Sequence, residues 1–229
     1  MLSATPRHGP HQSQRVAEAG ARLGDARAAV VLVHGRGATA ESILTLADAF
    51  AQPDVAYLAP QASGNAWYPH SFLAPLALNE PGLSSGHQAI DDVLRTVEEA
   101  GVPTERTVVL GFSQGACLAL EYVARTPRRY GGAVALSGGL IGTGSLDGGG
   151  PPDDKAFTYA GSLDGTRVFL GCSDVDAHIP VGRVHRSAEV LRALGGEVTE
   201  RIYPGMGHTV NEDEIRFVLS LLASLVGPA

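Results

Sequence analysis

The 229-residue chain is poor in cysteine, has no excess of positive charge and lacks long apolar runs, and each shortage excludes a class of protein. Its two cysteines, Cys117 and Cys172, cannot form the disulfide framework of a small secreted domain, so we expect buried thiols in a reducing compartment. A net charge of -7 with scattered arginines leaves no basic stripe for nucleic-acid phosphates. No apolar run approaches the roughly 18 residues of a membrane span, so we expect no stable membrane insertion.

The first residues also lack the signature of a signal peptide. Residues 1–27 are polar and rich in Ala and Gly, without a charged start followed by an apolar core. We therefore predict a loosely ordered arm over residues 1–27 and a cytoplasmic location.

Apolar runs alternate with helical stripes over the remainder of the chain. Residues 28–33, 54–60, 106–112, 131–139 and 166–174 are typical of buried strands. Residues 197–205 alternate in polarity and indicate a strand nearer an edge, and Asn211 with Glu214 forms a capping box for the last helix. The pattern predicts one α/β domain over residues 28–229, with a mostly parallel sheet and helices on both faces.

A serine stands between two glycines at the end of one predicted strand. The segment "GFSQG", Gly111 to Gly115, follows the run 106–112 and precedes a helical stripe. Ligands meet the carboxyl ends of strands in an open parallel sheet. A sharp strand-to-helix turn there would present Ser113 as a nucleophile, with no room for side chains at the flanking positions. The alternative is a plain tight turn, so the prediction depends on partners elsewhere in the chain.

A serine hydroxyl is a poor nucleophile unless a base takes its proton and a carboxylate orients that base. In this architecture the order along the chain is Ser, acid, His, each after a later strand. The segment "CSDVDAHIP" supplies Asp174 and Asp176, and "GMGH" places His208 before the last helix. Five other histidines precede the acid, His178 lies within its loop, and His185 lies in a helical pattern. We predict His208 as the base, with Asp174 and Asp176 as rival acids.

Six segments between Val31 and Val210 resemble a known family: "VLVHGRGAT", "APQASGNAWYP", "GFSQGACLAL", "LSGGL", "DAHIP" and "GMGHTV". With them the chain resembles the carboxylesterase/phospholipase branch of the α/β-hydrolase superfamily, which includes acyl-protein thioesterases. The resemblance implies the α/β-hydrolase fold. It also selects Asp176 as the acid, because the acid of that family stands four residues before a proline, here Pro180.

Two backbone N–H groups are expected to receive the negative charge of the attacked carbonyl oxygen. One belongs to Gln114, the residue after the nucleophile, at the start of a helix. By the resemblance the other belongs to Arg36 in "HGRG", where the family usually has an apolar side chain. Two placements are open for the Arg36 side chain, toward an acidic or polar substrate group or into solvent, and we expect solvent.

Residues 61–86 carry much apolar surface without a clean helical or strand period. We predict that this segment forms a wall for an acyl or aryl group, with a core-packed loop as the alternative. The expected wall residues are Trp67, Tyr68, Phe72, Leu73 and Leu76. A Gly/Pro/Asp-rich loop over residues 142–154 is expected at the opposite rim, with an insertion that has no role in the site as the alternative.

These features predict a serine carboxylesterase that cleaves small to medium acyl or aryl esters through an acyl-enzyme on Ser113. A lysophospholipase or acyl-protein thioesterase is one alternative, and a non-catalytic α/β-hydrolase scaffold for a hydrophobic ligand is another. "HGRG" lacks the remainder of a P-loop or dinucleotide fingerprint, and no predicted helix pairs histidines with a glutamate at metal-binding spacing. We expect no cofactor or metal, a small-molecule ester as partner and no nucleic acid, and the resemblance leaves a homodimer open.

Overall fold

The computed structural model describes residues 9–143 and 157–227. Seven strands form one sheet in the order β1-β3-β2-β4-β5-β6-β7, and every neighbouring pair is parallel except β1 with β3. The strands are β1 (Val16–Gly20), β2 (Ala28–Val33), β3 (Val55–Pro60), β4 (Thr107–Phe112), β5 (Gly132–Leu136), β6 (Arg167–Ser173) and β7 (Glu197–Tyr203). The predicted loop over residues 142–154 falls almost wholly outside the described residues.

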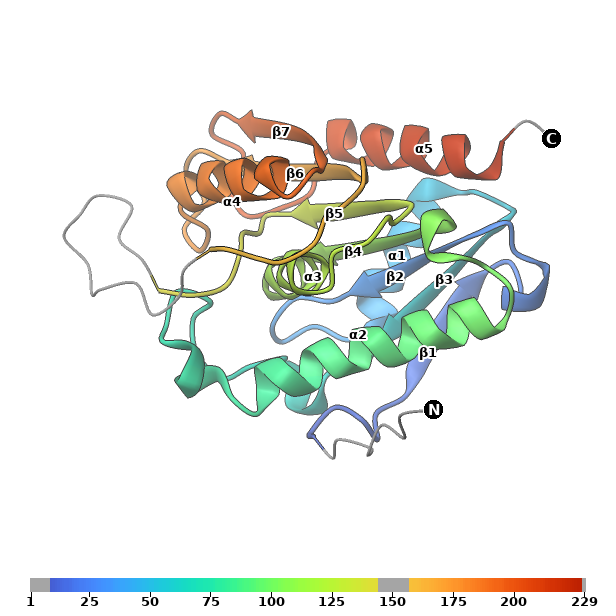
Figure 1. Cartoon of the computed structure of the whole chain (residues 1–229), viewed down its shortest axis with the longest axis horizontal. Helices are drawn as coiled ribbons and strands as arrows, with labels where there is room; N and C mark the ends of the chain where they lie inside the picture. The colour runs from blue at the N-terminus through green and yellow to red at the C-terminus, as the bar shows by residue number, and fades with distance from the viewer. Residues whose placement is uncertain (1–8, 144–156, 228–229) are drawn as a thin grey trace.

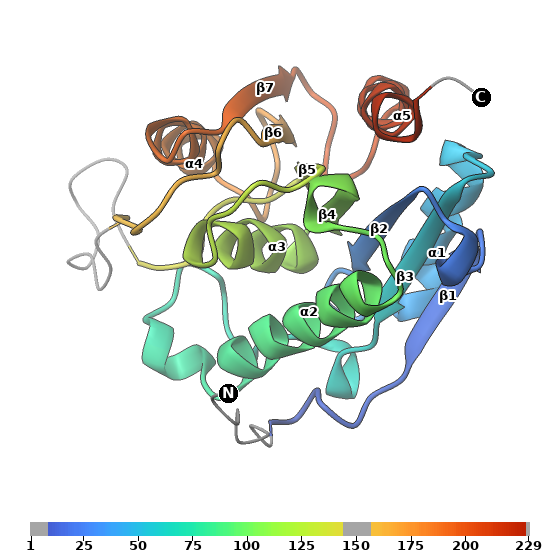
Figure 2. The ribbon, with the colours of Figure 1, turned by 45° about the vertical axis from the view of Figure 1, so that its right-hand side comes forward.

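Helices cover both faces of the sheet, as predicted (Figure 1). They are α1 (Ala40–Phe50), α2 (Gly82–Glu99), α3 (Gln114–Arg125), α4 (Val181–Ala193) and α5 (Glu212–Val226), with short 3-10 turns η1 (Leu23–Asp25), η2 (Ser63–Asn65), η3 (Leu76–Asn79) and η4 (Thr104–Arg106). Figure 2 shows α1 and α5 on one side of the sheet and α2, α3 and α4 on the other.

The central strands are apolar throughout because both of their faces are buried. In β2, Val30 and Leu32 pack into the cluster that contains α1 and α5, whereas Val31 and Val33 pack into the cluster that contains α2, α3 and α4. Since successive side chains of a strand point to opposite faces, a strand between two helical layers needs apolar residues at every position. The strand β7 lies at the sheet edge, as its alternating pattern predicted.

The N-terminal region differs from the prediction of a loosely ordered arm over residues 1–27. Residues 16–20 form β1, which pairs antiparallel with β3 from Val16 opposite Pro60 to Gly20 opposite Ala56. The side chain of His11 is also buried, at 4% exposure. Backbone pairing along an edge orders this segment with little apolar burial of its own, so the domain begins before residue 28.

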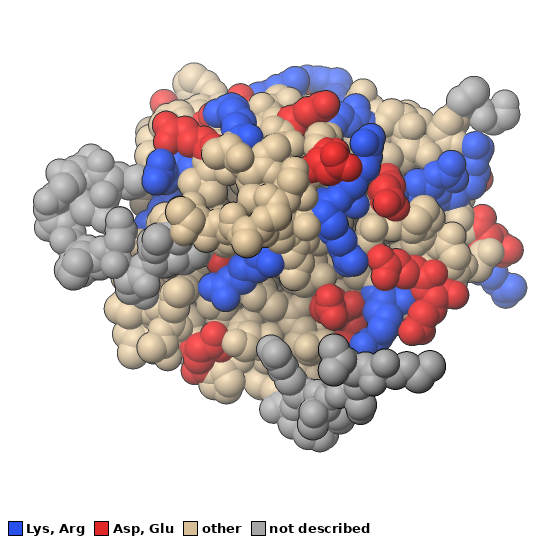
Figure 3. Space-filling model, in the orientation of Figure 1, with Lys and Arg blue, Asp and Glu red and all other residues tan. Residues whose placement is uncertain are grey.

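Charged side chains are spread in small groups of both signs on the face drawn in Figure 3. The figure shows no continuous basic stripe on that face. Among the helices of the described residues, none is both long and apolar enough to cross a membrane.

Candidate active site

The turn between β4 and α3 holds Ser113 in a strained backbone conformation. Its φ is 55° and its ψ is -120°, in the left-handed half of φ space that few residues other than glycine adopt. A Cβ on Gly111 would lie 2.2 Å from the carbonyl oxygen of Gly115, and a Cβ on Gly115 would lie 2.1 Å from that of Val33. The two glycines therefore let α3 start directly against the sheet, which leaves the serine hydroxyl at the end of β4.

Three side chains that are far apart in the sequence meet at this edge of the sheet. The Oγ of Ser113 lies 2.8 Å from Nε2 of His208, and Nδ1 of His208 lies 2.7 Å from Oδ2 of Asp176. An ionised carboxylate only accepts hydrogen bonds, so Nδ1 carries the proton. Nε2 is then free to accept a hydrogen bond from the serine hydroxyl.

The carboxylate of Asp176 is fully buried behind His208. Burial alone would raise its pKa, but hydrogen bonds from His208 and from the backbone N–H groups of His178 and Ile179 outweigh burial and lower it. The acid is therefore ionised at neutral pH. Asp174 is placed differently, because its Oδ1 accepts a hydrogen bond from the backbone N–H of Gly205 at 2.7 Å. It holds the loop that carries His208 and does not contact the imidazole.

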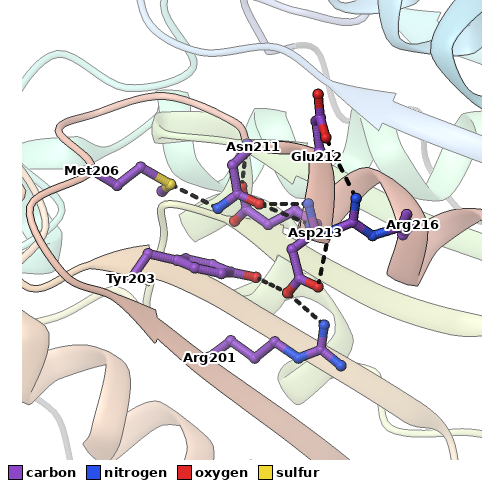
Figure 4. A network of polar contacts seen from close by, with 8 residues as sticks. Arg201, Tyr203, Met206, Asn211, Glu212, Asp213 and Arg216 are labelled. Carbon is purple, nitrogen blue, oxygen red and sulfur yellow. Dashed lines mark hydrogen bonds and ion pairs between the residues drawn. The ribbon is translucent and has the colours of Figure 1, made fainter.

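The loop of His208 is also held by a polar network between β7 and α5 (Figure 4). Asp213 accepts hydrogen bonds from the Arg201 guanidinium at 2.6 Å and from the Tyr203 hydroxyl at 2.9 Å. Asn211 caps α5 by accepting from the N–H groups of residues 213 and 214. Both ends of the loop are therefore fixed, and His208 is held between them.

A cleft of about 640 Å³ opens above Ser113. Its lining includes Gly35, Arg36, Ser113, Gln114 and His208. Among the described residues, no group accepts a hydrogen bond from the backbone N–H of Arg36 or of Gln114. Two backbone donors beside a nucleophile can receive negative charge from an attacked carbonyl oxygen.

The sequence and the fold have counterparts among known proteins. The profile of the family described as Phospholipase/Carboxylesterase matches residues 16–226. The chain belongs to the phospholipase/carboxylesterase family. The crystal structure of a phospholipase/carboxylesterase from Dyadobacter fermentans is similar to it at 39% identity, with a TM-score of 0.83, over 92% of this chain and 96% of that chain.

Curated relatives of this phospholipase/carboxylesterase family member include acyl-protein thioesterases. Acyl-protein thioesterase 1 of Saccharomyces cerevisiae is 26% identical over 88% of this chain and 94% of that protein. The enzyme of the same name from Gibberella zeae is 28% identical over 64% of this chain, and the match spans 60% of that protein's length. The chain is accordingly an enzyme of the carboxylic-ester hydrolase class.

The pocket wall of this family member differs in part from the prediction. Tyr68 and Phe72 line the cleft, whereas Trp67, Leu73 and Leu76 do not. Leu73 and Leu76 pack against the core instead. Trp67 is fully buried below the wall, where its Nε1 donates a hydrogen bond to the carbonyl oxygen of His34. Composition indicated an apolar segment but not which of its side chains point to the core.

The rings of His11 and His34 lie against Trp67, at centroid distances of 5.2 and 5.0 Å. Each imidazole accepts a hydrogen bond from a backbone N–H, of Ser63 for His11 and of Ala62 for His34. The accepting nitrogen must be unprotonated, and burial lowers the pKa of both rings. These two neutral histidines support the wall from below.

Arg36 is exposed, in keeping with the expected solvent placement, but its side chain also lies against the wall segment, a contact that the prediction did not include. Its guanidinium donates hydrogen bonds to the carbonyl oxygens of Tyr68, Pro69 and His70, at 2.8, 2.9 and 2.7 Å. A planar group with five donors can engage three adjacent carbonyl oxygens at once.

Sequence reasoning missed several lining residues: Phe112, Cys117, His70, His178 and Ile179. Phe112 precedes the nucleophile and its ring centroid lies 5.0 Å from that of His208, and the ring centroid of His178 lies 4.8 Å from that of His208. Proximity in sequence to Ser113 or Asp176 was the available signal for all of them except His70, which lies in the apolar segment 61–86. No group of three or more His, Cys, Asp or Glu side chains suited to a metal ion occurs within residues 9–143 and 157–227.

Proposed function

We propose that this enzyme is a serine carboxylesterase that cleaves small to medium acyl or aryl esters through an acyl-enzyme on Ser113. The observation that carries the proposal is the continuous hydrogen-bonded chain from Ser113 Oγ through His208 to Asp176. With Asp176 ionised and a neutral His208 protonated on Nδ1, every atom of this hydrogen-bonded chain has a partner, and that pattern is the one a nucleophilic serine needs.

The proposed reaction has two stages. His208 Nε2 takes the hydroxyl proton as Ser113 Oγ attacks the ester carbonyl, and Asp176 stabilises the imidazolium that forms. The backbone N–H groups of Arg36 and Gln114 hold the oxyanion. His208 then gives its proton to the departing alcohol oxygen. In the second stage, water activated by the same imidazole hydrolyses the acyl-enzyme and restores the serine.

The cleft supports esters of modest size as substrates. Its volume of about 640 Å³ lies within the range of sites that enclose a small molecule. Tyr68, Phe72, Phe112 and Ile179 supply apolar surface beside the nucleophile. A medium acyl chain or an aromatic ring would contact these side chains directly.

A thioesterase or lysophospholipase is the second candidate function, because curated relatives of high coverage are named acyl-protein thioesterase 1. The same serine chemistry would cleave a thioester, so the two candidates differ in the length and attachment of the acyl group. The non-catalytic scaffold is disfavoured, since a binding module gains nothing from the strained Ser113 and its hydrogen-bonded partners.

Hydrolysis of p-nitrophenyl esters of increasing chain length tests the proposal. We expect activity that is highest on short to medium chains, and Ser113→Ala should lower kcat by at least about 10⁴-fold. A rate that rises steadily to long chains, or a clear preference for palmitoyl thioesters, would favour the second candidate. An intact enzyme whose rate is unaffected by Ser113→Ala would refute both.

The homodimer and the cytoplasmic location stay predictions, which gel filtration and fractionation can test.

A further inference from the structure

Arg36 connects two segments that meet at the cleft. Its backbone lies in the loop between β2 and α1, while its guanidinium contacts the carbonyls of three consecutive wall residues, 68 to 70. The guanidinium carbon also lies 6.0 Å from the centroid of the Tyr68 ring. One side chain thus holds the wall and the proposed donor loop in a fixed relation.

The Gln114 side chain also holds this wall segment. Its Oε1 accepts a hydrogen bond from the backbone N–H of Trp67 at 2.9 Å, and its Nε2 donates to the carbonyl oxygen of Tyr68 at 2.8 Å. Gln114 is 6% exposed, so water competes little for these bonds. The two residues proposed to supply the oxyanion N–H groups therefore hold overlapping parts of this segment with their side chains, Gln114 residues 67 and 68 and Arg36 residues 68–70.

The spacing between two oxyanion donors must be set before the reaction for both to act. A displacement of about 1 Å at such a site can cost on the order of 100-fold in rate. α3 fixes Gln114, but the donor loop lies outside helix and strand. Among the described residues, its other links to this wall segment are Gly37 N–H to the carbonyl oxygen of Asn65, at 2.7 Å, and the bonds of His34.

We propose that the Arg36 side chain is a positioning group that fixes its own backbone N–H relative to that of Gln114, through the Tyr68 carbonyl oxygen that accepts hydrogen bonds from both side chains. The inference rests on the proposed function, in which both N–H groups hold the oxyanion. A planar guanidinium can engage three carbonyls at once, which neither an apolar side chain nor a lysine ammonium of different shape reproduces fully.

Substitution of Arg36 isolates the side chain, because every replacement except proline retains the backbone N–H. Arg36→Met is expected to lower kcat by about 10- to 100-fold with KM within about threefold, since positioning acts on the transition state. Arg36→Lys should be intermediate, and added guanidinium ion should restore part of the rate of Arg36→Met. Arg95→Met, in an exposed pair with Asp92, is the matched control and should leave kcat unchanged.

A second readout does not need activity. Trp67 is the single tryptophan of the chain, so acrylamide quenching of its fluorescence reports on the wall alone. Quenching should increase in Arg36→Met and not in Arg95→Met. Unchanged kcat and quenching in Arg36→Met would overturn the proposal, as would a raised KM with unchanged kcat, which would make Arg36 a substrate-binding group. If the parent protein hydrolyses no ester, the proposed function fails, while the quenching result still decides whether Arg36 holds the wall.

Discussion

At the scale of single residues, the carboxylate of Asp176 determines which nitrogen of His208 carries the proton. It lies 2.7 Å from Nδ1, and backbone N–H groups on its other oxygen hold it in place. Asp174 stands only two positions away but binds the backbone of Gly205. The two aspartates therefore offer a matched pair for separating a role in proton transfer from a role in holding a loop.

Asp176→Asn should lower kcat by about 10³- to 10⁴-fold, because an amide that donates to Nδ1 would leave the proton on Nε2 and block acceptance from Ser113. Asp174→Asn should lose less than about tenfold, since an amide oxygen can still accept from Gly205 N–H. Steady-state hydrolysis of one short ester by both variants measures this. Equal losses would show that the loop, rather than the imidazole tautomer, limits the rate.

At the scale of elements, the junction of β4 and α3 depends on close backbone contact. A side chain on Gly115 would meet the backbone of Val33, at the end of β2, and of His34 just after it, rather than the movable end of another side chain. The helix cannot yield without leaving the sheet, because residues of α3 are buried from Gln114 to Ala124. The position of Ser113 is thus tied to the stability of the whole junction.

Gly115→Ala should lower the free energy of unfolding by about 3 kcal/mol, as expected for severe overpacking. Gly24→Ala is the control, because nothing lies within 4 Å of a Cβ placed there, and it should change stability by less than about 0.5 kcal/mol. Urea unfolding followed by circular dichroism gives both values. Equal stability of the two variants would mean that the turn relaxes easily.

The start of α5 contains a buried acid next to the sheet. Glu214 accepts a hydrogen bond from Asn211 N–H through Oε2, while its other oxygen lies against Gly171 of β6 without a partner among the described residues. Burial raises the pKa of Glu214 to about 7, with a smaller contribution from the charge of Asp213. Its ordinary value is 4.5.

Between about pH 4.5 and 7 the folded state binds a proton on Glu214 more tightly than the unfolded state does. The protonated Glu214 therefore stabilises the folded state at low pH, and this contribution to the free energy of unfolding is lost as pH rises. Glu214→Gln carries no such charge. The unfolding free energy of Glu214→Gln relative to the parent should therefore rise by about 2–4 kcal/mol from pH 4.5 to pH 8. Urea unfolding at both pH values measures the difference. A difference independent of pH would show that Glu214 titrates normally.

At the scale of the whole molecule, the sequence sufficed for the parts whose pattern depends on local burial. Strands β2 to β6 have both faces covered, so their continuous apolar runs were enough to predict them as strands. The edge strand β1 was missed because pairing with β3 orders it without a buried apolar run. Trp67 was misplaced because its covering partner His11 is 56 residues away, and no local pattern encodes that contact.

The candidate site follows the same division. The meeting of Ser113, Asp176 and His208 was predictable from the sequence, because each follows a strand and the carboxyl ends of parallel strands lie at one edge of the sheet. The hold of Arg36 on the wall was not predictable, because it depends on the carbonyl directions of a segment without helix or strand.

The most direct test of the account is covalent labelling of the native enzyme by a fluorophosphonate, with the modified residue located by mass spectrometry of peptides. The account predicts one stoichiometric adduct on the serine of "GFSQG", lost in Ser113→Ala and strongly slowed in His208→Ala. An adduct on another serine, or a properly folded enzyme that stays unlabelled, would contradict it.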